Sequence, residues 1–393
     1  MQLKKTAALS AAVLFTAVGV PLLVWNMGQA ARKLGSQDKW LSRVAFGSYT
    51  LTLGASQKAE PSSSDVPKMH IISGSAGRFT ANNTTTLDIF TAPGEMESYG
   101  REFPTPLPSE EVLSAIPYIN DTSASDGVIT RLTFEDGDNE QFITLPGGSQ
   151  VRNCTDYDND YLLSIAGDSS DIDLSAADDE PLVLIYHTHA TETFEPAERD
   201  SYDSAFSCKT TESDMNIVSV GNEICRTLEE NGISVLHDTL VHDYPSYDAA
   251  YDSSRQTVSE LLEQYPGIKI CLDIHRDGIE RESGERLAPY CEINGKGAAQ
   301  IMIIACAGDG ELTVPDHLEN FKFACALQEQ IESDYPELCR PMLFDYRFYN
   351  QDLSHGSLLI EVGSQANSID EVRYTGALVG EEISRLIKNS AGD

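Results

Sequence analysis

Basic residues are scarce in this sequence. Its 393 residues contain 27 Lys and Arg against 62 Asp and Glu, which gives a formal net charge of −35. A nucleic-acid-binding surface needs clustered Lys and Arg to replace the counterions of the phosphate backbone. Docking on anionic lipid headgroups likewise needs a polybasic patch. The composition therefore argues against both of these classes of protein.

The sequence also lacks any C-x-x-C pair among its eight cysteines. This absence argues against a structural zinc knuckle and against a thioredoxin-like redox motif. Cys271 and Cys306 lie within apolar, strand-like runs, where a thiol usually behaves as a small buried hydrophobic group. An even number of cysteines would allow disulfides outside the cytoplasm, but the spacing assigns none.

One long hydrophobic stretch lies at the N-terminus. Lys4 and Lys5 precede an uncharged stretch from Thr6 to Ala31, which is long enough to cross a ~30 Å hydrocarbon core as a helix. Residues 1–31 are therefore predicted to be a transmembrane anchor, with a cleaved signal sequence as the alternative. We expect a single-pass protein of the cell membrane whose remaining residues are extracytoplasmic.

Residues 32–180 have a mixed character. Ala59–Pro67 has the composition of a linker, whereas Thr84–Phe90 and Gly127–Phe134 alternate like strands between turn residues. Residues 167–180 form an acidic linker. This segment is predicted to be an extracytoplasmic stalk or a small β-rich module, and the composition does not decide between them.

From Pro181 onward, strand and helix patterns alternate. Leu182–Tyr186 is a short apolar run typical of a strand buried on both faces. This alternation predicts an α/β domain over residues 181–390, with an open, mostly parallel sheet and helices on both faces. The active site of such a sheet lies beyond the carboxyl ends of its strands. The other expected strands are 233–236, 268–274, 300–306 and 358–362, and the expected helices are 214–231, 252–265, 316–333 and 368–388.

Side chains that can bind a metal follow these strands. His187, His189 and Glu192 come after the first strand, and His275 ends another. A single His at a strand end is more often structural, but two imidazoles and a carboxylate together suit tetrahedral zinc, whose open fourth position holds a water with a pKa lowered to ~7. The strand is expected to end near Tyr186, so the two rings of His187 and His189 diverge. We therefore favour His189 as the ligand and assign His187 to the support of the site or to substrate contact.

Glu361 follows an apolar run in which little water is expected. It is predicted to be the general base that takes a proton from metal-bound water and passes it to a leaving amine. The alternative is a carboxylate neutralised by Arg276 or Arg373. Arg276, which adjoins His275, is a candidate for stabilising a developing oxyanion. Phe348–Ser354 is either a substrate-facing loop or an ordinary surface turn.

Four motifs carry a family resemblance: Ile185–Glu192, Asp273–Asp277, Tyr349–Leu353 and Leu358–Gly363. In order and spacing they resemble the stage II sporulation protein P family of endospore-forming bacteria, over about residues 181–390. The resemblance implies an N-terminal anchor and a catalytic domain similar to the zinc-dependent N-acetylmuramoyl-L-alanine amidases. Carried over by motif, the zinc ligands are His189, His275 and Glu192, and Glu361 is the base. Glu212 is the alternative third ligand, because it resembles the glutamate of the wider group at a helix start.

The resemblance also implies a reaction and a setting. The expected reaction is hydrolysis of the amide between N-acetylmuramic acid and L-alanine, in septal peptidoglycan during sporulation engulfment. The expected partners are a lytic transglycosylase, stage II sporulation protein D, and a membrane protein, stage II sporulation protein M. Two alternatives stay open, namely a peptidoglycan endopeptidase at the same metal site and a non-catalytic septal scaffold. The presence of Glu361 argues against a scaffold, because a structural zinc is closed by four ligands and needs no base.

Overall fold

The computed structural model describes residues 103–104, 106–174, 180–308 and 313–391. The anchor or signal sequence predicted at residues 1–31, and the strand predicted at 84–90, lie outside the described residues. Within the described ranges, no helix combines the length and the hydrophobicity that a membrane crossing requires.

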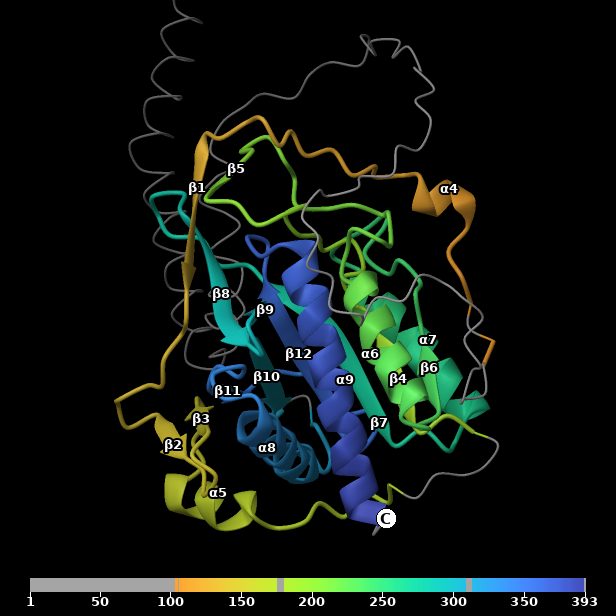
Figure 1. The fold of residues 1–393 in the computed structure, drawn as a ribbon. Coiled ribbons are helices and arrows are strands. Elements are labelled where there is room, and N and C mark those ends of the chain that lie inside the picture. The colour runs from red at the N-terminus through yellow and green to blue at the C-terminus, as the bar shows by residue number, and fades with distance from the viewer. Residues whose placement is uncertain (1–102, 105, 175–179, 309–312, 392–393) are drawn as a thin grey trace, which may run out of the picture. The chain divides into compact units, whose positions relative to one another are not determined.

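The centre of the described part is a large, mostly parallel sheet. Five of its seven neighbouring strand pairs are parallel, and the other two are antiparallel. Within the described ranges this sheet has eight strands (Figure 1), in the spatial order β2 (Phe142–Thr144), β3 (Gln150–Asn153), β11 (Met342–Asp345), β10 (Ile301–Cys306), β12 (Ser357–Ser364), β7 (Ile270–Asp277), β4 (Val183–Tyr186) and β6 (Val235–His237).

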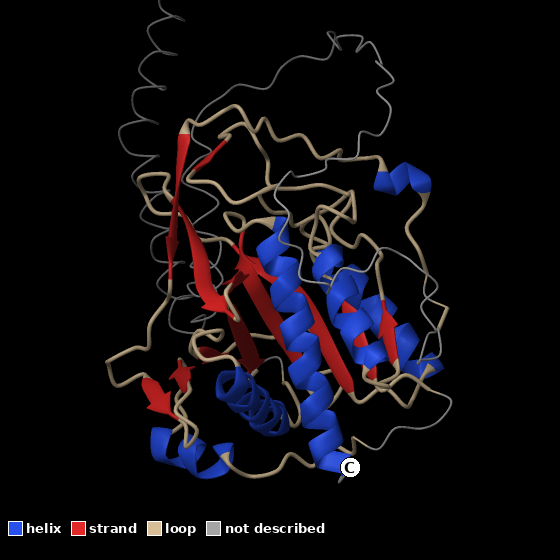
Figure 2. Ribbon diagram, in the orientation of Figure 1, coloured by secondary structure: helices blue, strands red, loops and turns tan. Residues whose placement is uncertain are grey.

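Helices cover both faces of this sheet. Val183 and Ile185 of β4 enter the main hydrophobic core with side chains of α6, α8 and α9, which lie on the face turned to the viewer in Figure 1. Leu184 and Tyr186 point to the opposite face, where they pack with side chains of α7. The predicted α/β fold, with helices on both faces of a mostly parallel sheet, is therefore confirmed. Figure 2 shows the helices of the described residues, which are α4 (Glu110–Leu113), α5 (Asn159–Ala166), α6 (Val218–Glu230), α7 (Ala250–Gln264), α8 (His317–Asp334) and α9 (Ile369–Ala391).

The segment before residue 181 joins the same packing. A second sheet has the order β5 (Ser201–Tyr202), β1 (Gly127–Leu132), β8 (Arg286–Ile293) and β9 (Lys296–Ala299), and β1 runs parallel to β8. In the central sheet β3 runs parallel to β11. Strands from before and after the predicted boundary at residue 181 therefore pair with one another in both sheets.

The eight cysteines, all within the described ranges, form no disulfides. Cys271 and Cys306 are buried in the sheet as their apolar surroundings predict. Covalent cross-links therefore contribute nothing to the stability of this fold, which depends on its apolar cores.

Candidate metal and catalytic site

His275 and Glu361 lie side by side at the carboxyl ends of two neighbouring strands. The parallel register of β7 and β12 places His275 opposite Glu361. Ile274 and Ile360 enter the main core, so His275 and Glu361, one residue further along each strand, point to the opposite face, on which α7 lies. The loop that carries His189 follows β4, which pairs with the other edge of β7. The predicted residues thus meet at one edge of the sheet.

Glu192 and His275 form the closest pair of predicted ligands. Glu192 Oε2 lies 3.6 Å from His275 Nδ1, and both side chains are buried. Two ligands held at ~2.0–2.1 Å from a tetrahedral zinc lie about 3.3 Å apart. The pair therefore has nearly the spacing that a shared zinc ion requires.

His189 lies next to this pair on the same side of the sheet. Its ring centroid is 5.4 Å from that of His275, and the rings are nearly perpendicular, at 88°. Its Nδ1 is buried without a hydrogen bond and lies 3.9 Å from Asp243 Oδ2. A buried polar atom without a partner is costly in a folded protein, and here it gives the ring a nitrogen that is free to bind a ligand.

These residues supply donor atoms of the kinds that zinc binds. Among the described residues, no group of three or more His, Cys, Asp or Glu side chains is placed so that it could hold a metal ion. Two imidazoles and a carboxylate are nevertheless ligands that zinc prefers, and the spacing of Glu192 and His275 fits it. Glu212, the alternative third ligand, is exposed, and its carboxylate accepts a hydrogen bond from the backbone N–H of Tyr118 (2.9 Å).

Asp273 holds His275 from behind. Its Oδ1 lies 2.8 Å from His275 Nε2, and its two oxygens accept hydrogen bonds from the backbone N–H and the hydroxyl of Thr188 (2.8 and 2.6 Å). Burial disfavours a charged imidazole, but Asp273, with help from Glu192 and Glu361, outweighs it and raises the pKa of His275 to about 10. Asp273 lies against Nε2, although this contact lacks the geometry of a hydrogen bond, and Nδ1 is the nitrogen that faces Glu192. A carboxylate against the second ring nitrogen is the arrangement that orients histidine ligands of metals.

Glu361 is half-buried next to these groups, and one of its oxygens is buried and unpaired. Its Oε2 has no hydrogen-bond partner. Burial raises the pKa of Glu361 to about 8, and the negative charges of Asp277 and Glu192 add to that effect, while His275 and Arg340 oppose it. A carboxyl group whose pKa lies near neutrality can both accept and release a proton.

Arg276 uses its side chain to hold backbone. The guanidinium donates hydrogen bonds to the carbonyl oxygens of Thr193 (2.8 Å), Cys208 (3.1 Å) and Asp277 (3.1 Å). Its backbone N–H donates to Glu192 Oε2 (3.1 Å). These contacts fix the loop that carries Glu192, and the role of Arg276 toward an oxyanion stays a prediction.

His187 is not brought to the other predicted residues. It is fully buried, with Nδ1 2.9 Å from the carbonyl oxygen of Ile274 and Nε2 2.9 Å from Nε2 of His237. A Cβ built on Gly221 of α6 would lie 2.6 Å from His187 Nε2, so this ring lies on the α6 side of the sheet. Burial lowers the pKa of His187 to about 4.

Two tyrosines pack against His189, and a third packs behind one of them. Tyr247 stacks on its ring at 4.2 Å and 10°, and Tyr251 of α7 meets it edge-on at 5.5 Å and 89°. Tyr349 in turn stacks on Tyr251 at 5.4 Å. The sequence analysis did not single out Tyr247, Tyr251 or Asp243, because no local pattern links them to the histidines. Asp273 could have been found, since a charged residue within an apolar strand and in phase with His275 is unusual.

The predicted loop Phe348–Ser354 mainly ties elements together. The amide of Asn350 donates to the carbonyl oxygen of Tyr251 and to the hydroxyl of Ser254, both at 3.1 Å. Gln351 accepts from the N–H of Cys306 at 2.8 Å and donates to the carbonyl oxygen of Ile304 at 2.9 Å. The loop therefore joins α7 to β10, and Tyr349 connects it to the tyrosines around His189.

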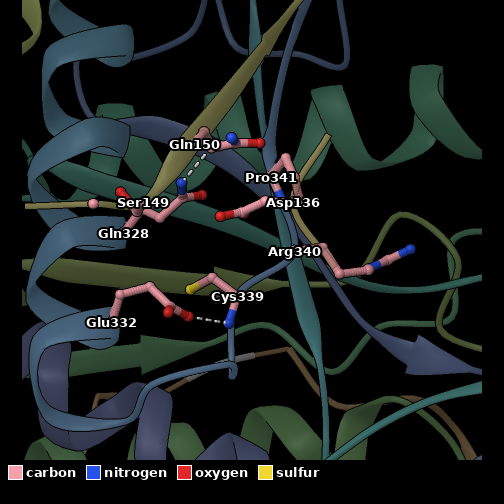
Figure 3. A pocket seen from close by; sticks show the side chains of 9 residues that line it. Asp136, Ser149, Gln150, Gln328, Glu332, Cys339, Arg340 and Pro341 are labelled. Atoms are coloured by element: carbon pink, nitrogen blue, oxygen red, sulfur yellow. Dashed lines mark hydrogen bonds between the residues drawn. The ribbon is translucent and has the colours of Figure 1, made fainter. Parts of the chain in front are cut away.

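A separate cavity of about 40 Å³ lies between β3, α8 and the approach to β11 (Figure 3). Gln150, Gln328 and Glu332 line it, and Glu332 accepts a hydrogen bond from the N–H of Cys339 (2.5 Å). None of the predicted site residues lines this cavity, so it is not part of the candidate metal site.

Comparison with known sequences finds relatives for most of the described part. The family model described as "Stage II sporulation protein P (SpoIIP)" matches residues 116–384. Stage II sporulation protein P of Bacillus subtilis (strain 168) is 26% identical over 219 residues, which cover 53% of this chain and 51% of that protein. The chain thus matches about half the length of this curated relative.

Comparison with solved structures finds two amidases at low TM-scores and low sequence identity. N-acetylmuramoyl-L-alanine amidase AmiC2 of Nostoc punctiforme is 13% identical, with a TM-score of 0.33, over 54% of this chain and 98% of that one. The CwlD amidase from Clostridioides difficile, in complex with the GerS lipoprotein, is 14% identical, with a TM-score of 0.34, over 54% and 99%. These similarities are too distant to assign a role to any residue.

Proposed function

The chain belongs to the stage II sporulation protein P family, and on this basis we propose that it is a zinc-dependent N-acetylmuramoyl-L-alanine amidase that degrades septal peptidoglycan during sporulation. The observation that carries the proposal is the approach of Glu192 Oε2 to His275 Nδ1, 3.6 Å apart. His189 lies beside this pair, and Glu361 lies next to His275 in register.

The proposed zinc ligands are His189, Glu192 and His275. Bound there, zinc would supply Lewis acidity, which polarises the amide carbonyl and makes a water molecule a nucleophile near neutral pH. The chain itself holds the ligands in place. Asp273 fixes the orientation of His275, and the backbone N–H of Arg276 fixes the carboxylate of Glu192.

Glu361 is the proposed proton carrier. In its ionised form it would accept a proton from the attacking water and deliver it to the leaving amine, which is poorly expelled without protonation. Its buried, unpaired Oε2 supports this role, because no neighbouring donor occupies the oxygen that would accept the proton. Its Oε2 is shielded from solvent, and a charge with little water around it acts more strongly on the reacting groups.

The location and partners are proposals that follow from sequence alone. The apolar stretch from Thr6 to Ala31 is the basis for a membrane-anchored protein with an extracytoplasmic catalytic domain. The family resemblance is the basis for proposing stage II sporulation proteins D and M as partners.

Replacing Glu361 with Gln tests the mechanism. The variant Glu361→Gln is expected to lose about 10²–10⁴-fold in the rate of peptidoglycan hydrolysis, with its zinc content unchanged, because the amide cannot accept the proton. The measurement is digestion of purified sacculi, with mass spectrometry of the released products and elemental analysis of the protein. Glu212→Gln is the matched control, and it should keep both activity and zinc.

The products separate the alternatives. An amidase releases free stem peptides, whereas an endopeptidase at the same site releases uncross-linked muropeptides, and a scaffold releases neither. Undiminished hydrolysis by Glu361→Gln would remove this residue from the mechanism.

A further inference from the structure

Lys209 lies at the rim of the candidate metal site. Its backbone forms an isolated antiparallel bridge with Glu192, one of the proposed zinc ligands. Its Nζ lies 3.7 Å from the centroid of the Tyr247 ring, and Tyr247 stacks on His189 at 4.2 Å. These two short distances place the ammonium and the imidazole on opposite faces of one aromatic ring. Lys209 is thus separated from a proposed zinc ligand by a single side chain.

The ammonium of Lys209 has no counter-ion of its own. Within the described part of the chain, it forms no ion pair and donates no hydrogen bond, although the whole sequence carries 62 acidic residues. Other cations near the site are occupied: Arg276 binds three carbonyl oxygens, and Arg340 pairs with Asp277 at 3.0 Å. Lys209 is therefore the cation of this region that has a charge to offer to a ligand.

The environment of Lys209 makes an anionic ligand favourable. The residue is half-buried, and burial lowers its pKa, while Asp243 and Glu192 act in the opposite direction. The face of the Tyr247 ring replaces only part of the hydration that a half-buried ammonium loses. A carboxylate would supply a charge-assisted hydrogen bond, which is stronger than a bond between neutral groups. Tyr247 meanwhile holds the flexible lysine side chain in position through its ring face.

We propose that Lys209 is a specificity-determining residue that binds a carboxylate of the peptide part of the substrate. This inference rests on the proposed amidase function and adds to it the means of choosing among peptides. The peptide is the part of the substrate that brings free carboxylates, whereas an N-acetylated sugar brings hydroxyls and amides.

Binding measurements on the full 393-residue chain test the proposal independently of catalysis. The probes are a soluble disaccharide–peptide and derivatives in which its carboxylates are converted to carboxamides, one at a time. Isothermal titration calorimetry should show about tenfold weaker binding for one derivative with the native chain. The unmodified probe should bind Lys209→Gln about tenfold more weakly than it binds the native chain. Lys209→Gln should bind that same derivative no more weakly than it binds the unmodified probe. Lys209→Arg should restore most of the preference, because it keeps the charge.

Kinetics and a matched control complete the test. Lys269→Gln removes the same charge from a lysine at the opposite end of β7, whose Nζ donates to the carbonyl oxygen of Pro266, and it should leave the preference intact. If the native chain hydrolyses the probe, Lys209→Gln should raise KM about tenfold and change kcat little. The proposal is overturned if no derivative distinguishes the native chain from Lys209→Gln, or if the variant lowers kcat alone for every probe. A native chain that shows the binding preference but no hydrolysis would contradict the proposed function and leave this inference standing.

Discussion

Each histidine near the site is oriented by a different kind of partner. Asp273 holds Nε2 of His275, a stacked tyrosine ring holds His189, and a backbone carbonyl and a second histidine hold His187. An imidazole next to a carboxylate is stabilised in its charged form, whereas a buried imidazole facing another imidazole is stabilised in its neutral form. Three chemically identical side chains at the same end of the sheet therefore have different proton affinities.

The buried pair of His187 and His237 predicts a loss of stability in acid. Burial lowers the pKa of His187 from 6.5 to about 4, and burial together with His187 lowers that of His237. The unfolded chain therefore binds more protons than the folded chain between these pH values, so the free energy of unfolding falls as the pH falls below 6.5. For His187 alone the expected loss is roughly 2–3 kcal/mol between pH 7 and pH 4.5. Urea denaturation of the metal-free protein at both pH values measures it.

The variant His237→Gln is the control for this pair. A glutamine amide can donate to neutral His187 and can accept from the protonated ring, so it removes the clash between two N–H groups. Its stability should depend less on pH than that of the native chain over the same range. Equal pH dependence in the two proteins would show that the pair is not responsible.

Among the elements, β12 has the most demanding geometry. Its register with β7 shifts between Glu361 and Ser364, and Gly363 within this bulge has φ of +61°. A Cβ on Gly363 would lie 2.7 Å from Asn367 Oδ1 and 2.9 Å from the Cβ of Ala299. The bulge lies next to Glu361, so its conformation determines how the end of the strand presents that carboxylate.

Replacing Gly363 with Ala should therefore impair both stability and activity. The left-handed conformation costs about 1–2 kcal/mol with a Cβ, and crowding against Ala299 adds a further ~1–3 kcal/mol. Gly232→Ala is the matched control, because Gly232 has φ of +79° and a Cβ there would meet nothing within 4 Å. Chemical denaturation should show a clearly larger loss for Gly363→Ala, together with reduced sacculus digestion. Equal losses at the two glycines would mean that the bulge tolerates a side chain.

Periodicity predicted the elements that are long or apolar, and little beyond them. The apolar run at residues 182–186 and the helical spacing at 214–231 correspond to β4 and α6. The hairpin of β8 and β9 was missed, although Asn294 and Gly295 at its turn, both with positive φ, are a strong hairpin signal. The short strands β2, β3 and β11 become strands only through pairing with neighbours distant in sequence, which local patterns do not encode. The antiparallel pairing of β10 with β12 is likewise a tertiary feature.

The candidate site divides in the same way. His189, Glu192, His275 and Glu361 lie at or just beyond strand ends, so the rule that active sites lie beyond the carboxyl ends of parallel strands was sufficient to group them. Asp243, Tyr247 and Lys209 lie on loops, and their approach to His189 depends on how those loops fold back over the sheet. Sequence patterns gave the proposed ligands, whereas the surrounding residues required coordinates.

On the scale of the whole molecule, residues 106–174 complete the described fold. Val151 and Leu162 are fully buried in the main core, and Ile143 and Leu145 are nearly so. Arg131 of β1 pairs with Glu371, a buried residue of α9. The family model also begins well before residue 181, at 116. The described part of the segment predicted as a stalk or a small β-rich module therefore supplies part of the core on which the site edge is built.

Removing this segment should destabilise the fold that holds the proposed site residues, although none of those residues is removed. A chain shortened to residues 181–393 would lose apolar side chains that contribute about 1.5–3 kcal/mol each, against a usual total stability of ~5–15 kcal/mol. It would also leave the Glu371 carboxylate buried without its arginine, which is costly, and expose the edge of β11 to pairing with other chains. We expect this shortened chain to aggregate or to unfold without a cooperative transition in urea, and to digest sacculi poorly.

A chain of residues 103–393 is the control and should unfold cooperatively. If the shorter chain unfolded cooperatively with a free energy within about 1 kcal/mol of the longer one, residues 103–180 would be an appendage to a self-sufficient domain, and the site edge would owe its geometry to residues 181–391 alone.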